Sequence, residues 1–354
     1  MTSQTDIRFR FPKTVTFDDV LLVPQLSSIE SRSSIDVSID MKNVGNLSLP
    51  IISSPMDTVT GEEMLATLGS KRILSIMHRY NKANEQVSSL SNAEKAGARI
   101  MGAAVGVTGD FMSRVRSMVA AGVDVVCLDV AHGHHTMMKT AITQLRKEFP
   151  TLHIMAGNVA TREGYEDLCD WGADSVRVGI GGGSICSTRI KTGHGVPTLQ
   201  SVLDCAMSDR DGMIIADGGI RTPGDIVKAL AAGADMVMLG SMLAGTDESP
   251  GDIMDVSEII GGIQVHSKYK AYRGMASVEA QVDWRGRTSS VEGVSSKIPY
   301  KGSVDNVINS IENGIRSGLS YSGANNIKHF QSKAKFIRQT NAGLQESKTH
   351  VYNL

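Results

Sequence analysis

The sequence predicts an α/β fold, a (β/α)8 or TIM barrel that carries a long lid after its eighth strand. Three observations favour this fold. Eight short apolar segments alternate with helix-like segments, and the Gly- and Asp-rich motifs follow the apolar segments. Such a barrel takes roughly 250 residues, or 200 to over 400 with insertions, so a chain of 354 residues fits one barrel. An open doubly wound sheet is the alternative.

The eight predicted strands are short runs of Val, Ile, Met, Leu and Ala, as expected for parallel strands buried on both faces. They span residues 49–55, 72–77, 99–106, 123–131, 152–159, 175–180, 212–220 and 235–242. Helices are predicted over residues 108–121, 136–149, 161–171, 199–208 and 222–232. Several of them end at a glycine, the residue most often found just past a helix C-terminus. These glycines are Gly122, Gly172 and Gly233.

The segment that follows the eighth predicted strand has a different composition. Residues 245–300 show few apolar periods and many Gly, Ser and charged residues. A loop of this length in a compact domain is usually functional, so we expect a flap over the barrel mouth. Two helices, over residues 303–319 and 327–339, are expected to close the barrel. The whole chain, residues 1–354, is then one domain.

Charge and cysteine usage exclude several classes of protein. Lys and Arg number 36 against 37 Asp and Glu, for a net charge of -1, which favours neither a nucleic-acid nor a membrane partner. No apolar run approaches the ~20 residues that span a bilayer. Residues 1–12 alternate Arg with Phe and lack the apolar core of a secretory signal. The four cysteines form no CxxC pair, so we expect a cytoplasmic protein with free thiols.

One cysteine ends a glycine-rich segment, GIGGGSICSTR at residues 179–189, directly after the sixth predicted strand. Glycines allow positive φ and close approach of the backbone to a ligand. Such loops cradle anions with N–H groups or surround a cation with C=O groups. A thiol exposed beside these backbone dipoles is in the setting of a nucleophile. Cys186 is therefore the candidate nucleophile, with a small buried apolar residue as the alternative interpretation.

The other polar motifs also follow predicted strands, and in a barrel these strand ends share one mouth, where barrel enzymes hold their active sites. The motifs are SPMD at 54–57, DVAHGH at 129–134, Gly157-Asn158, DGG at 217–219 and Gly240-Ser241. Loops after strands seven and eight often bind a phosphate, and here they contain the last two motifs. The segment DVAHGHH contains His132, His134 and His135 close together on one loop. No further ligand follows at the defined spacing of a metal site, so we expect no metal there.

Together these residues resemble the IMP dehydrogenase / GMP reductase family over about residues 16–338. The motifs that carry the resemblance are TFDDVLLVP at 16–24, SPMDTV at 54–59, the cysteine loop, ADGGI at 216–220, MLGSMLA at 238–244, YRGM at 272–275 and PYKG at 299–302. The resemblance implies a (β/α)8 barrel, usually a homotetramer, that acts on a purine mononucleotide (GMP or IMP) with a nicotinamide cofactor.

Within this family the chain looks like a divergent GMP reductase. Family dehydrogenases usually carry a pair of CBS modules after the second strand, but residues 77–80 run straight into a helical segment. The segment CSTRIKTG at 186–193 is similar to the reductase pattern, and the flap lacks the Arg–Tyr pair with which dehydrogenases activate water. SPMD, DVAHGH and PYKGS are closer to dehydrogenase spellings. An IMP dehydrogenase without CBS modules, oxidising IMP to XMP with NAD, is the alternative.

The reductase resemblance implies a role for each motif. Cys186 attacks carbon 2 of GMP, ammonia leaves, and NADPH delivers hydride to the thioimidate to give IMP. Thr188 and Glu292 form a proton relay, because a threonine alone is too weak an acid. All three residues are present, which argues against a non-catalytic purine nucleotide-binding protein.

The binding residues follow from the same resemblance. Those implied for the nucleotide are Ser184, Gly219, Gly240 and Ser241 at the phosphate, Asp217 at the ribose, and Tyr272, Gly274 and Met275 over the nucleotide. Those implied for the dinucleotide are Asp129 and Asn158, with Arg285 and Arg287 as candidates for the extra phosphate of NADPH. A potassium ion is expected at the carbonyls of Gly181, Gly183 and Cys186, with Arg189 nearby.

Overall fold

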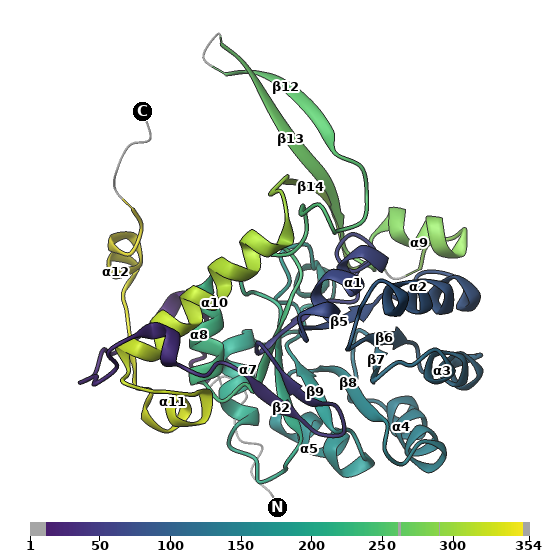
Figure 1. The fold of residues 1–354 in the computed structure, drawn as a ribbon, viewed down its shortest axis with the longest axis horizontal. Coiled ribbons are helices and arrows are strands. Elements are labelled where there is room, and N and C mark those ends of the chain that lie inside the picture. Colours follow the sequence, from purple (N-terminus) through teal and green to yellow (C-terminus); the bar gives the residue numbers. More distant parts are fainter. Residues whose placement is uncertain (1–11, 261–262, 290, 350–354) are drawn as a thin grey trace, which may run out of the picture.

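Eight parallel strands close into a barrel at the centre of the protein (Figure 1). The computed structural model describes residues 12–260, 263–289 and 291–349. The prediction that the first residues are not a secretory signal therefore falls on residues outside the described ranges. In barrel order the strands are β10 (Met213–Asp217), β11 (Met236–Leu239), β4 (Ile51–Ser53), β5 (Leu74–Met77), β6 (Gly102–Val105), β7 (Val125–Asp129), β8 (His153–Val159) and β9 (Ser175–Val178). Each predicted apolar segment contains one of them. The predicted TIM barrel is confirmed, and the doubly wound alternative is wrong.

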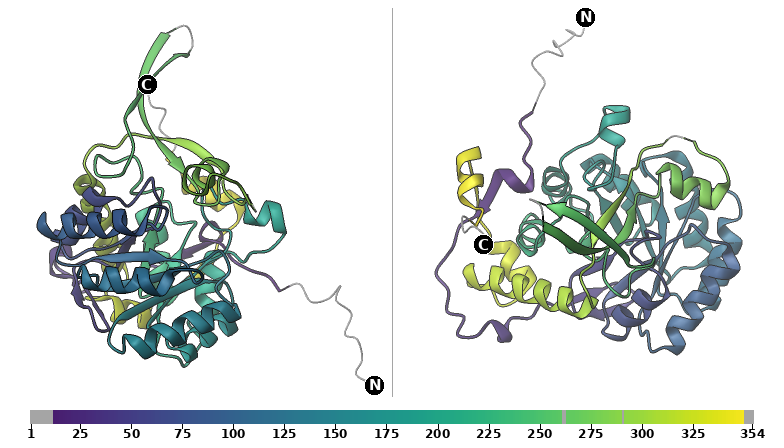
Figure 2. Two further views of the ribbon diagram at one scale, coloured as in Figure 1. Left: turned by 90° about the vertical axis from the view of Figure 1, so that its right-hand side faces the viewer. Right: turned by 90° about the horizontal axis from the view of Figure 1, so that it is seen from above.

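Helices surround the barrel (Figures 1 and 2). They are α1 (Glu62–Ser70), α2 (Ala83–Lys95), α3 (Phe111–Ala120), α4 (Thr136–Glu148), α5 (Arg162–Trp171), α6 (Thr188–Thr192), α7 (Thr198–Cys205), α8 (Pro223–Ala231) and α10 (Val304–Tyr321). Their ends follow local chemistry. Thr222 and Asp225 cap each other at the start of α8, with Pro223 in its first turn, and α5 ends at Gly172 with φ +112°. The helices predicted between strands are confirmed to within a few residues.

Neighbouring residues of one strand belong to two different apolar clusters. In β11, Met236 and Met238 pack inside the barrel, whereas Val237 packs against the surrounding helices. This explains the continuous apolar runs, because both faces of each strand are buried. A hairpin of β2 (Ile39–Met41) and β3 (Gly45–Leu47) adds its own apolar side chains to the inner cluster. It closes the barrel at the amino ends of the strands and leaves the carboxyl ends for the site.

The flap has regular structure, which the sequence did not predict. It contains the antiparallel strands β12 (Met254–Ile260), β13 (Ile263–Arg273) and β14 (Ser295–Pro299), and the helix α9 (Val278–Arg285). The β12–β13 hairpin projects from the body of the protein (Figures 1 and 2). Because few described side chains of this hairpin are buried, its strands lack the apolar runs that identify the barrel strands.

The C-terminal region differs from the prediction in one place. The helix predicted over 303–319 is confirmed as α10, but the helix predicted over 327–339 ends early. It is split into α11 (Ile327–Lys333) and a strand, β15 (Phe336–Arg338), which pairs antiparallel with β1 (Val20–Leu22). This pairing joins segments more than 300 residues apart, so local sequence does not reveal it. Short 3-10 helices (Phe17–Asp19 and Arg32–Ser34) and α12 (Asn341–Glu346) complete the elements. Within the described ranges, no helix combines the length and apolar character needed to cross a membrane.

Candidate active site

A cavity of about 450 Å³ opens at the carboxyl ends of the barrel strands. Its walls include the cysteine loop, the loops after β10 and β11, and parts of the flap. The structure brings every predicted catalytic and nucleotide-binding residue to this cavity, along with Asp129, Asn158, Arg285, Gly181 and Gly183. Arg189 and Arg287 are not among the residues that line it. The motifs gathered from distant parts of the sequence therefore form one site.

A chain of hydrogen bonds joins the thiol to a carboxylate. The Cys186 thiol donates to the Thr188 hydroxyl at 3.2 Å, and that hydroxyl donates to Glu292 Oε2 at 2.8 Å. The main chain holds the cysteine loop and the flap together on both sides of the cysteine. Ser187 N donates to Glu292 O at 2.8 Å, and Val294 N donates to Ile185 O at 3.0 Å. This arrangement can carry a proton between a carboxyl group and a reacting atom next to the sulfur.

Glycines allow the loops of the site to pack backbone against backbone. A Cβ atom on Gly274 would lie 3.2 Å from the Cα of Gly293 in the flap. At Gly179, with φ +144°, a Cβ atom would overlap the carbonyl oxygen of Asp217. Larger residues at either position would push the cysteine loop away from its neighbours.

Three of the four predicted phosphate residues, Ser184, Gly240 and Ser241, meet around Tyr272 at one corner of the cavity. The Tyr272 hydroxyl lies 3.3 Å from Ser184 Oγ and 3.1 Å from the place that a Cβ atom would take on Gly240. Burial raises the pKa of Tyr272, so its hydroxyl keeps its proton and can donate a hydrogen bond. Ser241 also lines this corner. Hydroxyl groups and free main-chain N–H groups are the donors that a phosphate requires.

A buried arginine connects two carboxylates in the wall of the cavity. Arg177 Nη1 lies 2.7 Å from Asp129 Oδ1, and its Nη2 lies 2.9 Å from Asp217 Oδ2. Asn158 Nδ2 also donates to Asp217 at 2.8 Å, and Arg79 Nε donates to Asp129 at 3.2 Å. Burial would raise the pKa of Asp129, but the charges of Arg177 and Arg79 outweigh it and lower that pKa overall. Asp129 therefore stays an ionised acceptor at neutral pH.

Sequence reasoning missed several of these charged residues. Arg177 is 7% exposed and stands in β9, among residues buried on both faces. A lone charge in an apolar run was the available signal. Arg273 belongs to the motif YRGM, but the sequence assigns it no role. It pairs with Asp57, at 2.6 Å, and with Asp283 in α9, at 2.5 Å, and so joins the flap to the loop after β4.

The two arginines predicted for the cofactor lie in different surroundings. Arg285 lines the cavity, and its Cζ lies 4.4 Å from the ring centroid of Trp284. The Trp284 ring in turn lies 4.7 Å from the ring of Tyr80, which also lines the cavity. Arg287 is exposed and does not line the cavity. Among the described residues it has no hydrogen bond or ion pair with a cavity residue. Arg285 is thus the better placed of the two.

The three residues predicted to hold potassium, Gly181, Gly183 and Cys186, offer only main-chain oxygens. Gly183 O accepts a hydrogen bond from Cys186 N at 3.1 Å. Arg189 lies behind the loop, where its Nη2 donates to Val196 O at 2.6 Å and to Ile180 O at 3.3 Å. Carbonyl oxygens are suitable ligands for a hard cation, so the chemistry of these groups fits potassium.

Two of the three adjacent histidines have partners of their own. His135 accepts a hydrogen bond from Met137 N and so caps α4, and His134 Nε2 lies 2.7 Å from Asp167 Oδ2. Among residues 12–260, 263–289 and 291–349, no group of three or more His, Cys, Asp and Glu side chains is arranged to hold a metal ion.

Comparison with known proteins identifies the family. The model of the IMP dehydrogenase / GMP reductase domain matches residues 14–350, nearly the whole chain. The chain belongs to the IMP dehydrogenase / GMP reductase family. The resemblance read from the motifs is thereby confirmed. Both activities in that family name are oxidation–reduction reactions of a purine nucleotide.

The similar proteins carry both names. An inosine-5'-monophosphate dehydrogenase of Nitrosopumilus maritimus (strain SCM1) is 32% identical over 96% of this chain and 98% of that protein. Another, of Bacillus subtilis (strain 168), is 46% identical over 75% of this chain, but the match spans only 55% of that protein. A solved structure of a GMP reductase variant from Trypanosoma brucei, in complex with guanosine 5'-monophosphate, is 30% identical with a TM-score of 0.90. It covers 98% of this chain and 100% of that one.

This family member carries no regulatory module after the second barrel strand. β5 ends at Met77 and α2 begins at Ala83, so a short connection joins them directly. The prediction of a barrel without inserted CBS modules is confirmed.

Proposed function

We propose that this protein is a GMP reductase, which converts GMP to IMP and ammonia with NADPH as the reductant. The observation that carries the proposal is the hydrogen-bonded chain from Cys186 through Thr188 to Glu292. Removal of an amino group needs both a nucleophile for the purine carbon and an acid for the departing nitrogen. A thiol and a carboxyl group connected by one hydroxyl supply both.

The reaction divides into two steps around Cys186. First its sulfur, as the thiolate, forms a bond to carbon 2 of the purine, and the bond from that carbon to the amino nitrogen breaks. Thr188 passes a proton from Glu292 to the nitrogen, which leaves as ammonia. Reduced nicotinamide, when bound, supplies the hydride that replaces the amino group. The carbon–sulfur bond then breaks, and the thiolate is released with IMP.

The cavity walls support the binding of both reactants. Ser184, Gly219, Gly240 and Ser241 would hold the 5'-phosphate, Asp217 the ribose hydroxyls, and Tyr272, Gly274 and Met275 would cover the nucleotide. Asp129 and Asn158 remain the proposed dinucleotide contacts. Arg285 presents a cation at the cavity, which favours NADPH over NADH through its extra phosphate.

Potassium is proposed as a structural cofactor of the cysteine loop, held by the carbonyls of Gly181, Gly183 and Cys186. Replacing potassium with lithium in the buffer is expected to lower kcat, because the smaller ion does not fit the same carbonyl spacing and the thiol loses its position. Turnover measured in the two salts at equal ionic strength tests this. Equal rates in both would contradict the proposal.

A homotetramer is proposed from the family, and light scattering of the purified chain tests it.

IMP dehydrogenase is the second candidate, and the names of the curated relatives favour it. The Bacillus subtilis relative, at 46% identity, is an inosine-5'-monophosphate dehydrogenase. In that case the same thiol would attack IMP, and NAD would accept the hydride before water released XMP. The flap would then have to supply a base for water, and Arg285 is the flap arginine that lines the cavity.

Nicotinamide absorbance separates the two candidates. Purified protein in potassium buffer is given GMP with NADPH, or IMP with NAD. Loss of NADPH that requires GMP, with formation of IMP and ammonia, supports the reductase. Appearance of NADH with IMP identifies a dehydrogenase instead. If GMP binds but neither mixture reacts, the protein is a non-catalytic nucleotide-binding member of the family.

Replacing Glu292 with glutamine is expected to lower kcat for GMP by about 10²- to 10⁴-fold, the usual contribution of a general acid. The amide keeps the shape of the carboxyl group and can still bond to Thr188, but it cannot deliver a proton. Glu279 is the matched control, since it lies in the flap helix α9, is exposed and bonds to Ser295 Oγ. Glu279→Gln should keep nearly full activity. A Glu292→Gln enzyme as active as this control would remove the carboxyl group from the mechanism.

A further inference from the structure

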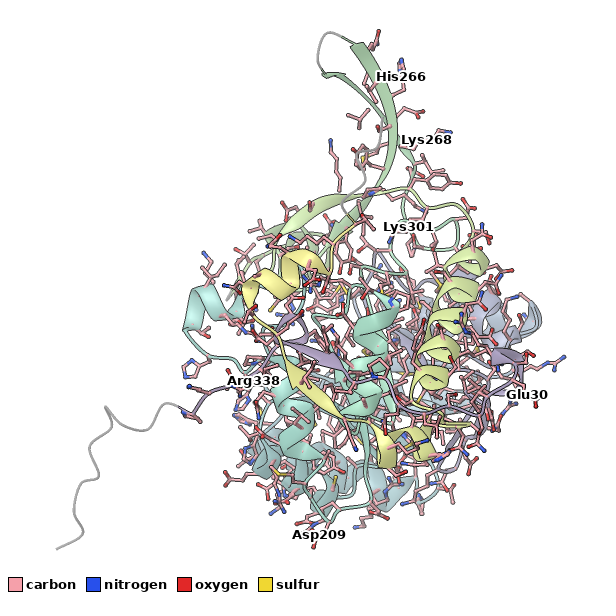
Figure 3. The ribbon with its side chains drawn as sticks, turned by 90° about the vertical axis from the view of Figure 1, so that its left-hand side faces the viewer. Glu30, Asp209, His266, Lys268, Lys301 and Arg338 are labelled. Carbon is pink, nitrogen blue, oxygen red and sulfur yellow. The ribbon has the colours of Figure 1, made fainter. Side chains whose placement is uncertain are left out.

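A lysine lies beneath the turn that follows β11. The Nζ atom of Lys301 donates to the carbonyl oxygens of Ser241 at 2.5 Å, Met242 at 3.1 Å and Ala244 at 2.8 Å. Lys301 N also donates to Gly245 O at 2.8 Å, which fixes the lysine backbone against the same segment. Figure 3 shows Lys301 where the projecting hairpin, which carries His266 and Lys268, joins the body of the protein.

The turn above this lysine has two chemically different ends. Gly240 O accepts hydrogen bonds from Leu243 N at 3.0 Å and from Ala244 N at 2.9 Å, so the segment forms a single helical turn. The first N–H groups of this turn, those of Gly240, Ser241 and Met242, have no hydrogen-bond acceptor among the described residues. Gly240 and Ser241 line the cavity. The last carbonyl groups of the same turn accept hydrogen bonds from the ammonium group of Lys301. The negative ends of the peptide dipoles therefore face the lysine, and their positive ends face the cavity at the free amides.

The charge of Lys301 is not neutralised nearby. Within the described ranges, no carboxylate lies at ion-pair distance from its Nζ, although ion pairs occur elsewhere. Burial lowers the pKa of Lys301 to about 8, so most of it is protonated at pH 7. An uncompensated cation thus lies behind a row of unpaired N–H groups, and this combination favours an anion on the other side.

We propose that Lys301 positions the phosphate-binding turn and sets the preference of the enzyme for nucleotides over nucleosides. By holding three carbonyls, the ammonium orients the amides of Gly240, Ser241 and Met242 toward the 5'-phosphate, and its charge adds to their dipoles. The inference rests on the proposed function, which places the phosphate at Gly240 and Ser241. Lys301 is a positioning residue, because it acts through the turn and does not touch the substrate.

A second lysine provides a matched control. Lys270 is 3% exposed, and its Nζ donates to the carbonyls of Thr246 at 3.0 Å, Asp247 at 3.3 Å and Ser249 at 2.5 Å. It therefore binds carbonyls in the same manner as Lys301, in the next segment of the same chain. None of its three partners lines the cavity. Its loss should disturb folding to a similar degree without changing the phosphate corner.

The test compares full-length Lys301→Met and Lys270→Met proteins by calorimetric titration with GMP and with guanosine. For Lys301→Met we expect GMP affinity to fall by about ten- to a hundredfold, the usual loss for a charge-assisted contact, with guanosine affinity unchanged. Lys270→Met should keep the wild-type ratio of the two affinities. Lys301→Gln serves if the methionine variant does not fold, since it keeps donors and loses only the charge, and Lys301→Arg should restore the ratio.

The outcomes separate this inference from the proposed function. If Lys301→Met weakens GMP and guanosine equally, or behaves like Lys270→Met, Lys301 is only structural and the inference is wrong. If the wild-type protein does not prefer GMP or IMP to guanosine, the phosphate placement fails and the proposed function fails with it. A wild-type preference that is lost in Lys301→Met supports the inference even where the turnover assay identifies a dehydrogenase.

Discussion

Replacing Cys186 with alanine is expected to lower kcat at least about 10⁴-fold while GMP still binds. Cys186 carries the only thiol among the described residues that line the cavity, and alanine leaves the glycine-rich loop and the phosphate corner in place. Absorbance of NADPH measures the loss of turnover, and calorimetry measures GMP binding. A Cys186→Ala protein with more than a few per cent of wild-type activity would rule out covalent catalysis.

Cys169 provides the control for this experiment. It is half-buried away from the cavity, and burial raises its pKa to about 11, so at neutral pH it remains an unreactive thiol. Cys169→Ala should keep full activity. Burial likewise raises the pKa of Cys127 to about 11 and that of Cys205 to about 12. Iodoacetamide should therefore label Cys186 first, and bound GMP should protect it. Labelling of another cysteine first, read by mass spectrometry, would contradict this order.

The barrel was predictable because its strands are buried on both faces. Burial on two sides demands continuous apolar runs, and β7 and β11 stand out in the sequence for that reason. The flap strands were not predictable. Lys270 and Tyr272 of β13 are buried while Ala271 between them is exposed, so polarity does not follow burial there. Lys270 can be buried because three carbonyl oxygens from another segment accept hydrogen bonds from its ammonium group.

The site was predictable wherever it depends on local chemistry. A cysteine that ends a glycine-rich loop, with a threonine two residues later, can be read directly from the sequence. Lys301 and Arg177 could not be assigned in this way, because their partners are distant in the chain. Lys301 meets carbonyls about sixty residues before it, and Arg177 meets aspartates more than thirty residues away on either side. Only the closed barrel and the returning flap bring these groups together.

Replacing Arg177 with methionine is expected to lower the free energy of unfolding by about 3–5 kcal/mol. Arg177 is 7% exposed and its guanidinium forms ion pairs with Asp129 and Asp217, so its removal leaves two carboxylates without their shared cation. Urea denaturation at neutral pH measures the change. Arg210 is the control, because its pairs with Asp170 and Asp209 are on the surface. Arg210→Met should cost less than about 1 kcal/mol.

Acid provides a second and independent test of the Arg177 network. The native pKa of Asp129 is lowered, so its ionised form stabilises the fold fully above its unfolded pKa of about 3.9, and this stabilisation is lost as pH falls through the lower native value. In Arg177→Met one of the two cations that lower this pKa is absent and only Arg79 remains, so Asp129 takes up its proton at higher pH. The stability difference between the two proteins should therefore be largest at neutral pH and shrink as acid protonates Asp129, first in Arg177→Met and then, below about pH 3.9, in the wild type. A constant difference across this range would mean that Arg177 stabilises the barrel by packing and not by charge.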